Sequence, residues 1–295
     1  MRPSRTRALI LSLRPKTLTA ALVPILVSTA LVWAYGHPLL PWVSVLALIS
    51  SIFIQVGTNL VNDALDFKKG ADGERRLGEA RATQQGWFTA NQVLAFGGVS
   101  FFLALLAGLP LVWWGGWPIL LIGILSLLCG YLYTGGPFPL AYVGLGDLFV
   151  ILFFGLVAVG GVFFLHTKSW GLPVAVAGLQ VGLLATVLIA INNLRDLDQD
   201  RLVNKKTMAV RLGPKLGRVE VIVLVGAAFA LQFYWWGEDR TWAFLLPLLA
   251  APFAVRVAWQ VWKKDATQEF NRLLAQASFV HILFGMLISL GLALK

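Results

Sequence analysis

Apolar residues occur along this chain in long, nearly continuous runs that are separated by short polar segments. A helix needs about 20 apolar residues to cross the hydrocarbon core of a bilayer, because each residue adds only about 1.5 Å to its length. By that measure the pattern predicts nine membrane spans. They are residues 18–35, 41–62, 93–113, 117–135, 142–165, 172–193, 219–236, 242–261 and 275–294. We therefore expect an all-α integral membrane protein with a single transmembrane domain over residues 1–295.

The composition agrees with this interpretation. Hydrophobic residues make up 58% of the chain and charged residues 13%, whereas about a quarter of a soluble protein is charged. The formal net charge is +10, but the basic residues flank apolar runs. That arrangement is typical of cytoplasmic loops beside an anionic leaflet and excludes a nucleic-acid interface. The single cysteine, Cys129, lies within an apolar run, so the sequence predicts no disulfide and no thiolate metal site.

Lysine and arginine residues gather on one side of the predicted topology. If the N-terminus is cytoplasmic, only Lys168, Arg240 and Lys295 of the 24 basic residues fall on the opposite side. The N-terminus is basic and then apolar, like a signal peptide. Since no small-residue cleavage site follows, we interpret it as the start of the first membrane helix. The expected location is the inner or plasma membrane of the cell, with the N-terminus and the acidic loops cytoplasmic and the C-terminus outside.

An acidic stripe, NLVNDALDFKKGAD over residues 59–72, closes the second predicted span. On a helix, Asn59, Asn62, Asp63 and Asp66 share one face, because residues three, four and seven apart lie close together. Carboxylates at the C-terminal end of a helix face the negative end of its dipole and also repel one another. A bound cation relieves this repulsion, so the stripe indicates a metal site.

A second acidic stripe, NNLRDLDQD over residues 192–200, follows the sixth predicted span. Its Asn192, Asp196 and Asp200 are four residues apart and again share one helix face. Four spans separate the two stripes, and this even number brings both to the cytoplasmic side. We therefore expect them to face each other across one cavity. For either stripe alone, a salt-bridged helix end beside a basic loop is the alternative interpretation.

The chemistry of the two stripes indicates a diphosphate site. Carboxylate and amide oxygens are hard ligands that suit Mg²⁺ or Mn²⁺, and Mg²⁺ is usually bound by one or two carboxylates together with substrate phosphates. Lysines accompany both stripes, at Lys68, Lys69, Lys205 and Lys206. Metal and lysines together neutralise a leaving pyrophosphate. Because the cavity behind them is apolar, we expect a polyprenyl diphosphate, whose ionisation gives an allylic carbocation that an electron-rich ring attacks.

Three further segments carry candidate residues, each with two interpretations. Residues 14–17, Arg-Pro-Lys-Thr, precede the first span and form either a flanking basic segment or a pyrophosphate contact. Asp147 lies within the fifth predicted span, where a carboxylate needs a pairing partner or a function. Tyr133 precedes the turn at residues 135–137 and is either an interfacial loop residue or a substrate contact.

Four stretches resemble the UbiA superfamily of intramembrane prenyltransferases, and they are spread over most of the chain. They are RPKTLTAALVP (14–24), QVGTNLVNDALDFKKGAD (55–72), YTGGPFPLAYVGLGD (133–147) and NNLRDLDQDRLVNKKTMAVRLG (192–213). The two aspartate motifs are specific for the superfamily. The KKGAD continuation and the last two stretches resemble its menaquinone branch, whose members prenylate 1,4-dihydroxy-2-naphthoate.

The resemblance implies nine helices around a central cavity, Mg²⁺-dependent binding of a polyprenyl diphosphate, and prenyl transfer to 1,4-dihydroxy-2-naphthoate with loss of CO₂. Carried over residue by residue, it implies metal ligands at Asn62, Asp63, Asp66, Asp72, Asp196 and Asp200. Among these, the predicted catalytic residues are Asp63, Asp66, Asp196 and Asp200. The predicted substrate-binding residues are Arg14, Lys16, Asn59, Asn62, Asn193, Lys205, Lys206, Tyr133 and Asp147. The superfamily's first motif often reads NDxxDxxxD, but here Gly70 stands where its last aspartate falls, which leaves the role of Asp72 open.

Two other functions are alternatives. The same chemistry can act on another acceptor, namely 4-hydroxybenzoate, homogentisate or a chlorophyllide, because acceptor choice depends on the shape of the cavity. A divalent-cation transporter needs acidic residues near the middle of its spans, whereas here they cluster at one membrane face. Neither the prenyl chain length nor the oligomeric state can be derived from the sequence.

Overall fold

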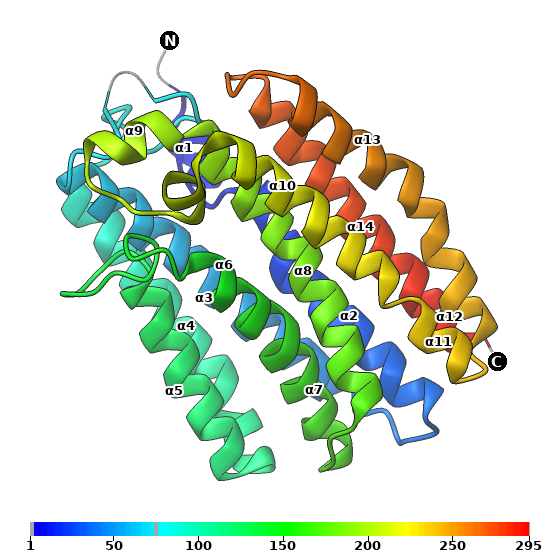
Figure 1. Cartoon of the computed structure of the whole chain (residues 1–295). Coiled ribbons are helices and arrows are strands. Elements are labelled where there is room, and N and C mark those ends of the chain that lie inside the picture. The colour runs from blue at the N-terminus through cyan, green and yellow to red at the C-terminus, as the bar shows by residue number, and fades with distance from the viewer. Residues whose placement is uncertain (1–2, 74–75, 295) are drawn as a thin grey trace.

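The computed structural model describes residues 3–73 and 76–294, without the side chain of Lys16. The predicted substrate contact of Lys16 therefore lies outside the described residues. Throughout the described ranges the regular structure is helical, with no strand. The helices lie side by side as one bundle, with α1 (Arg5–Ser12) at one end and the last turn of α14 (Phe270–Ala293) at the other (Figure 1).

The remaining elements follow one another up and down this bundle. They are η1 (Pro15–Thr17), α2 (Thr19–Ala34), α3 (Pro41–Lys68), α4 (Ala90–Gly115), α5 (Trp117–Leu132), α6 (Gly146–Val150), η2 (Ile151–Val157), α7 (Ala158–Thr167), α8 (Leu172–Arg195), α9 (Leu197–Leu202), α10 (Met208–Ala230), α11 (Phe233–Gly237), α12 (Thr241–Leu245), η3 (Leu246–Ala250) and α13 (Ala251–Lys263). The segment η2 is π-helical and joins α6 to α7 in one helical rod, while η3 joins α12 to α13.

Seven helical rods within the described residues are long and apolar enough to cross a membrane. The predicted count of nine spans is therefore not confirmed. The predicted spans 18–35 and 117–135 correspond to α2 and α5, apolar helices of 16 residues each. At about 1.5 Å per residue these two helices are about 24 Å long, which is shorter than the bilayer core of about 30 Å.

The bilayer-facing surface of the bundle is apolar. Large hydrophobic side chains lie exposed along α4 and α5, among them Phe102, Leu106, Leu109 and Leu121. In water such a continuous apolar surface is unfavourable, whereas in lipid it is the normal exterior of a helical protein. Together with the apolar rods, this surface makes the chain a multi-pass membrane protein.

Helix α8 is the central element of the bundle. In an apolar stretch of 18 residues, 78% of α8 is buried inside the protein, compared with 22% of the corresponding stretch of α4. It packs against η2, α10 and α14, and its side chains contribute to both of the large apolar cores. The backbone of η2 approaches α8 closely at Gly155, where an added Cβ would lie 2.4 Å from the carbonyl oxygen of Gly178. Glycines are required at this crossing because any side chain would separate the two elements.

The polar loops that follow α3, α5 and α9 lie at the same end of the bundle as α1 (Figure 1). Helix α3 ends in a Schellman motif, in which Gly70 adopts a positive φ of 76° and the amide of Ala71 donates to the carbonyl of Asp66 at 2.9 Å. Helix α4 begins with a capping box between Thr89 and Gln92. The connection between these two helix ends crosses the acidic end of α3.

Candidate active site

A polar cavity lies at this end of the bundle, between the two acidic stripes. The first stripe contributes Asn59, Asn62 and Asp66 to its wall, and the second contributes Asn192 and Asn193. The other predicted site residues in the wall are Arg14, Lys205, Tyr133 and Asp147. The structure therefore brings together segments from α3, α6, α8 and three loops around one space.

Asp66 is the carboxylate of the first stripe that faces the cavity. Arg81 donates to its Oδ2 at 2.9 Å, and the Tyr142 hydroxyl donates to its Oδ1 at 2.9 Å. The neighbouring Asn62 accepts a hydrogen bond from the hydroxyl of Thr134. Asp66 is thus connected to both the loop after α3 and the loop after α5, and only 4% of its surface is exposed.

Asp63 is held differently, although it belongs to the same motif. Its Oδ2 accepts from the amide of Ala82 at 2.9 Å, and its Oδ1 accepts from the amide of Thr83 at 3.3 Å and from the Thr83 hydroxyl. It does not line the polar cavity. Both oxygens of this carboxylate therefore bind the loop that covers the C-terminal end of α3.

Arg81, on that loop, is the cation at the centre of the first stripe. Besides its bond to Asp66, it forms an ion pair with Asp72 and donates to the backbone carbonyl of Asn62 at 3.2 Å. Asp72 also pairs with Arg76. Burial alone would lower the pKa of the Arg81 guanidinium, but the carboxylates around it raise this pKa above its ordinary value. Arg81 therefore stays charged and neutralises the stripe.

The second stripe carries its own cations. Arg195 donates to both carboxylate oxygens of Asp196, at 2.8 and 2.7 Å, and also to Asn192. Asp200 pairs with Lys205 at 3.4 Å, and its buried Oδ2 has no hydrogen-bond partner among the described residues. Burial raises the pKa of the Asp200 carboxyl to about 6 in spite of Lys205, whereas Arg195 holds the pKa of Asp196 below its ordinary value against the effect of burial.

Arg14 enters the cavity from the segment before the first long helix. It adopts a left-handed φ of 52°, which is uncommon for a residue with a side chain. Asn59 supports this conformation by donating from Nδ2 to the Thr17 hydroxyl at 3.0 Å. Burial, together with the nearby Arg81, lowers the pKa of Arg14 to about 9. Its buried Nη2 has no partner within the part of the chain that the structure describes, so this donor is available to an anionic ligand.

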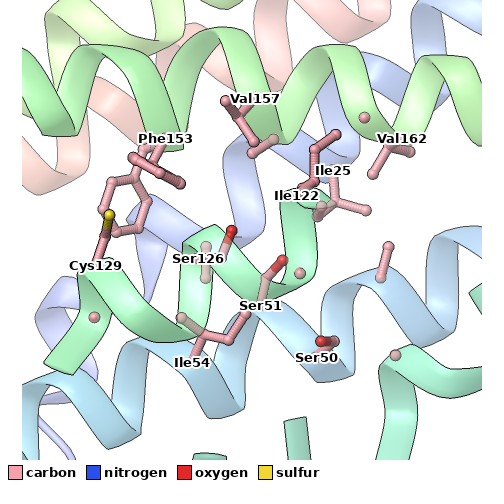
Figure 2. Close-up of a pocket in the computed structure, with 18 of the residues that line it drawn as sticks. Ile25, Ser50, Ser51, Ile54, Ile122, Ser126, Cys129, Phe153, Val157 and Val162 are labelled. Atoms are coloured by element: carbon pink, nitrogen blue, oxygen red, sulfur yellow. The ribbon is translucent and has the colours of Figure 1, made fainter. Parts of the chain in front are cut away.

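An apolar chamber continues from the polar cavity into the bundle. The two spaces share Ala20, Thr58, Tyr133, Val150 and Phe154 in their walls. Figure 2 shows the deeper part of the chamber, where side chains from α3, α5 and the η2–α7 rod surround the space. A ligand with a polar head and a long apolar tail fits this pair of spaces.

Comparison with known proteins identifies the family. The sequence profile of the UbiA prenyltransferase family matches residues 21–284. The chain belongs to this family. It is 37% identical to a 1,4-dihydroxy-2-naphthoate octaprenyltransferase of Haemophilus influenzae, over 95% of this chain and 93% of that protein. It is 36% identical to the enzyme of that name from Escherichia coli, over 99% of this chain and 97% of that protein.

The fold is that of solved UbiA homologues. A homologue from Aeropyrum pernix superimposes with a TM-score of 0.70 at 17% identity, covering 92% of this chain and 96% of that one. A homologue from Archaeoglobus fulgidus bound to GPP and Mg²⁺ superimposes with a TM-score of 0.63 at 16% identity, covering 97% of this chain and 99% of that one. The expected all-helical UbiA fold is therefore confirmed.

The side chains present fit a divalent cation that keeps substrate oxygens as ligands. Within the described ranges, no group of three or more His, Cys, Asp or Glu side chains is arranged to hold a metal ion alone. The donors at the cavity are carboxylate and amide oxygens, and behind its wall the buried Oδ2 of Asp200, which no other described residue donates to, is a hard oxygen ligand. Mg²⁺ is usually bound through one or two carboxylates plus phosphate oxygens, and this UbiA site offers such a partial set.

Several predicted site residues lie outside the cavity wall. Asp63, Asp72, Asp196, Asp200 and Lys206 do not line it. The first four are buried close behind the wall, whereas Lys206 is exposed. The sequence prediction for these residues stays a prediction.

Two residues of the site, Arg81 and Tyr142, were missed as candidates from the sequence. Arg81 lies in an irregular loop where no periodicity places it near Asp66, and Tyr142 is one of several loop tyrosines. The signal that the sequence offers for Arg81 is weak: it is a basic residue in a loop that follows an acidic helix end.

Proposed function

We propose that this protein transfers a polyprenyl chain from a polyprenyl diphosphate to 1,4-dihydroxy-2-naphthoate, releasing pyrophosphate and CO₂ and giving demethylmenaquinol. The observation that carries the proposal is the 37% identity, over 95% of the chain, to an enzyme named for this acceptor. The polar cavity and the adjoining apolar chamber support the donor, since one accepts a diphosphate and the other a prenyl tail.

In this proposal the diphosphate lies in the polar cavity, against Arg14, Arg81 and Lys205. The unpartnered Nη2 of Arg14 supports this position, because a phosphate oxygen completes its hydrogen bonding. Mg²⁺, or Mn²⁺ with the same preference for oxygen, supplies further charge neutralisation as the diphosphate leaves. Asn62 and the carboxylates Asp66, Asp72, Asp196 and Asp200 are the proposed residues that hold the ion. Asp63, the remaining ligand that the sequence predicts, is bound at both oxygens by Ala82 and Thr83 and would have to release them to reach the ion.

The reaction needs no base for a ring proton. The bond between the allylic carbon and the diphosphate oxygen breaks, and the diphosphate leaves with the electron pair. The ring carbon that bears the carboxylate forms the new carbon–carbon bond. The bond from that ring carbon to the carboxylate then breaks, its electron pair restores the aromatic ring, and CO₂ departs. The task of the protein is to bind the two substrates in contact and to exclude water from the carbocation.

The proposed topology places nine spans, including the two shorter helices α2 and α5, in the plasma membrane as a single domain over residues 1–295. The N-terminus and the acidic end of the bundle are cytoplasmic, and the C-terminus is outside. The distribution of basic residues supports this orientation, because the loops at the acidic end carry most of them.

The test is an assay of the purified protein in lipid nanodiscs with 1,4-dihydroxy-2-naphthoate, a polyprenyl diphosphate and Mg²⁺. Demethylmenaquinol and CO₂ are expected in equal amounts, and EDTA should stop the formation of both. Product from 4-hydroxybenzoate or homogentisate but not from the naphthoate would refute the acceptor assignment.

A pair of variants tests the proposed role of the second stripe. Asp200→Asn should reduce turnover, whereas Asp198→Asn should not. Asp198 is two residues away, but 96% of its side chain is exposed, so it is a matched control for the loss of a carboxylate. Equal turnover in the two variants would remove Asp200 from the proposed metal site.

A further inference from the structure

Asp147 is a buried carboxylate that no other residue satisfies. It lies at the start of α6, lines the polar cavity, and is only 7% exposed. Neither oxygen of Asp147 has a hydrogen-bond partner in another described residue. Asp147 also takes part in none of the ion pairs that the described residues of the site form. A buried carboxylate that receives no hydrogen bond from another residue is unfavourable, so a ligand that donates a hydrogen bond is expected there.

The position of Asp147 relates it to the acceptor and not to the diphosphate. On the same rod, Val150 and Phe154 line both the polar cavity and the apolar chamber, so Asp147 lies where the two spaces join. The Tyr133 hydroxyl lies close to Gly146, the residue before Asp147, since an added Cβ there would be 2.9 Å from this hydroxyl. An ionised Asp147 repels anionic groups, and none of the ion pairs between the described residues of the site neutralises it.

Of the two proposed substrates, only the acceptor can donate a hydrogen bond to this carboxylate. The diphosphate and the naphthoate carboxylate are anionic acceptors of hydrogen bonds, and the prenyl tail has no donor. The ring hydroxyls are donors. The 1-hydroxyl is adjacent to the 2-carboxylate and donates to it within the molecule, which leaves the 4-hydroxyl free.

We propose that Asp147 binds the 4-hydroxyl of the acceptor ring and thereby positions the ring for attack. With this end of the ring held at Asp147, the carboxylate end points away from Asp147, toward the cations Arg14, Arg81 and Lys205 in the wall of the same cavity. The carbon that bears the carboxylate then faces the allylic carbon of the diphosphate. Asp147 is therefore a substrate-binding residue that determines which ring carbon reacts. This inference rests on the proposed function.

The experiment is a thermodynamic cycle. The carboxylate is removed from the protein, the 4-hydroxyl is removed from the ligand, and the two changes are then combined. Affinities of the wild type, Asp147→Ala and Asp147→Asn are measured for 1,4-dihydroxy-2-naphthoate and for 1-hydroxy-2-naphthoate, which lacks the 4-hydroxyl. A hydrogen bond to a charged group corresponds to about a 10- to 100-fold change in affinity. We expect Asp147→Ala to lose that much affinity for the dihydroxy ligand and to change its affinity for the monohydroxy ligand by about twofold or less.

Asp147→Asn keeps the shape of the side chain and a weaker acceptor, so its loss should be smaller and again confined to the dihydroxy ligand. This variant also serves if the alanine variant does not fold. The KM for the polyprenyl diphosphate should stay unchanged in both.

Equal losses for the two ligands, or no loss for either, would overturn the assignment and indicate that Asp147 only stabilises the start of α6. Failure of the proposed function is a separate result, because then the wild type itself does not convert the dihydroxy ligand.

Discussion

Replacing Asp63 tests whether its carboxylate binds the metal ion or instead anchors the loop after α3. In the structure its two oxygens accept the amides of Ala82 and Thr83 and the Thr83 hydroxyl. Ala82 is fully buried and Thr83 is 4% exposed, so water cannot replace the carboxylate unless the loop opens. Asp63→Ala should therefore open the segment 76–89 locally.

The magnitude follows from the two amides. A buried N–H that loses its partner costs about 1–3 kcal/mol, so two of them cost at least about 2 kcal/mol. This corresponds to at least a roughly 30-fold faster hydrogen exchange at residues 82 and 83, if exchange occurs through local opening. Thr83→Val removes only the hydroxyl donor and leaves both amides bound. A hydrogen bond to a charged group contributes about 1.5 kcal/mol or more, so exchange should accelerate at least about 10-fold.

The assay is hydrogen exchange of the protein in nanodiscs, read by mass spectrometry over residues 76–89. Asp200→Asn is the control, since Asp200 pairs with Lys205 and forms no bond to this segment. Mg²⁺ binding is measured on the same samples. Unchanged exchange in Asp63→Ala together with lost Mg²⁺ binding would refute the anchoring argument and support Asp63 as a ligand.

Two further predictions concern stability. The pKa of Asp200 is about 6 in the folded protein, above its ordinary value of 3.8, so the folded state keeps a proton that the unfolded state releases. The free energy of unfolding should therefore decrease as the pH rises from about 4 to about 6, and Asp200→Asn should flatten this dependence of Tm; an unchanged slope would contradict it. Gly155→Ala should destabilise the protein by about 1–3 kcal/mol, because the added Cβ would lie 2.4 Å from the carbonyl oxygen of Gly178. Gly226→Ala, which meets nothing within 4 Å, is the matched control, and equal Tm values in detergent would exclude a tight crossing of η2 and α8.

Much of the fold can be predicted from the sequence because membrane helices are local features. Seven of the predicted spans correspond to long apolar rods, and the two acidic stripes end on the same side because an even number of spans separates them. The predicted count of nine spans is not confirmed, since the apolar runs around α2 and α5 end in turns that limit these helices to 16 residues. Helix ends depend on local capping and turn geometry, which the average hydropathy of a run does not determine.

For the candidate site, the sequence by itself determined which residue types are present and at which membrane face they lie, because helical spacing and the thickness of the bilayer fix both. The tertiary structure alone decided the partners. Arg81 reaches Asp66 across 15 positions of the sequence, and Tyr142 reaches it across 76. The loop that carries Arg81 also binds both oxygens of Asp63, whereas no other described residue donates to the Asp147 carboxylate. These pairings depend on irregular loops packed over helix ends, and no periodicity in the sequence encodes the path of such a loop.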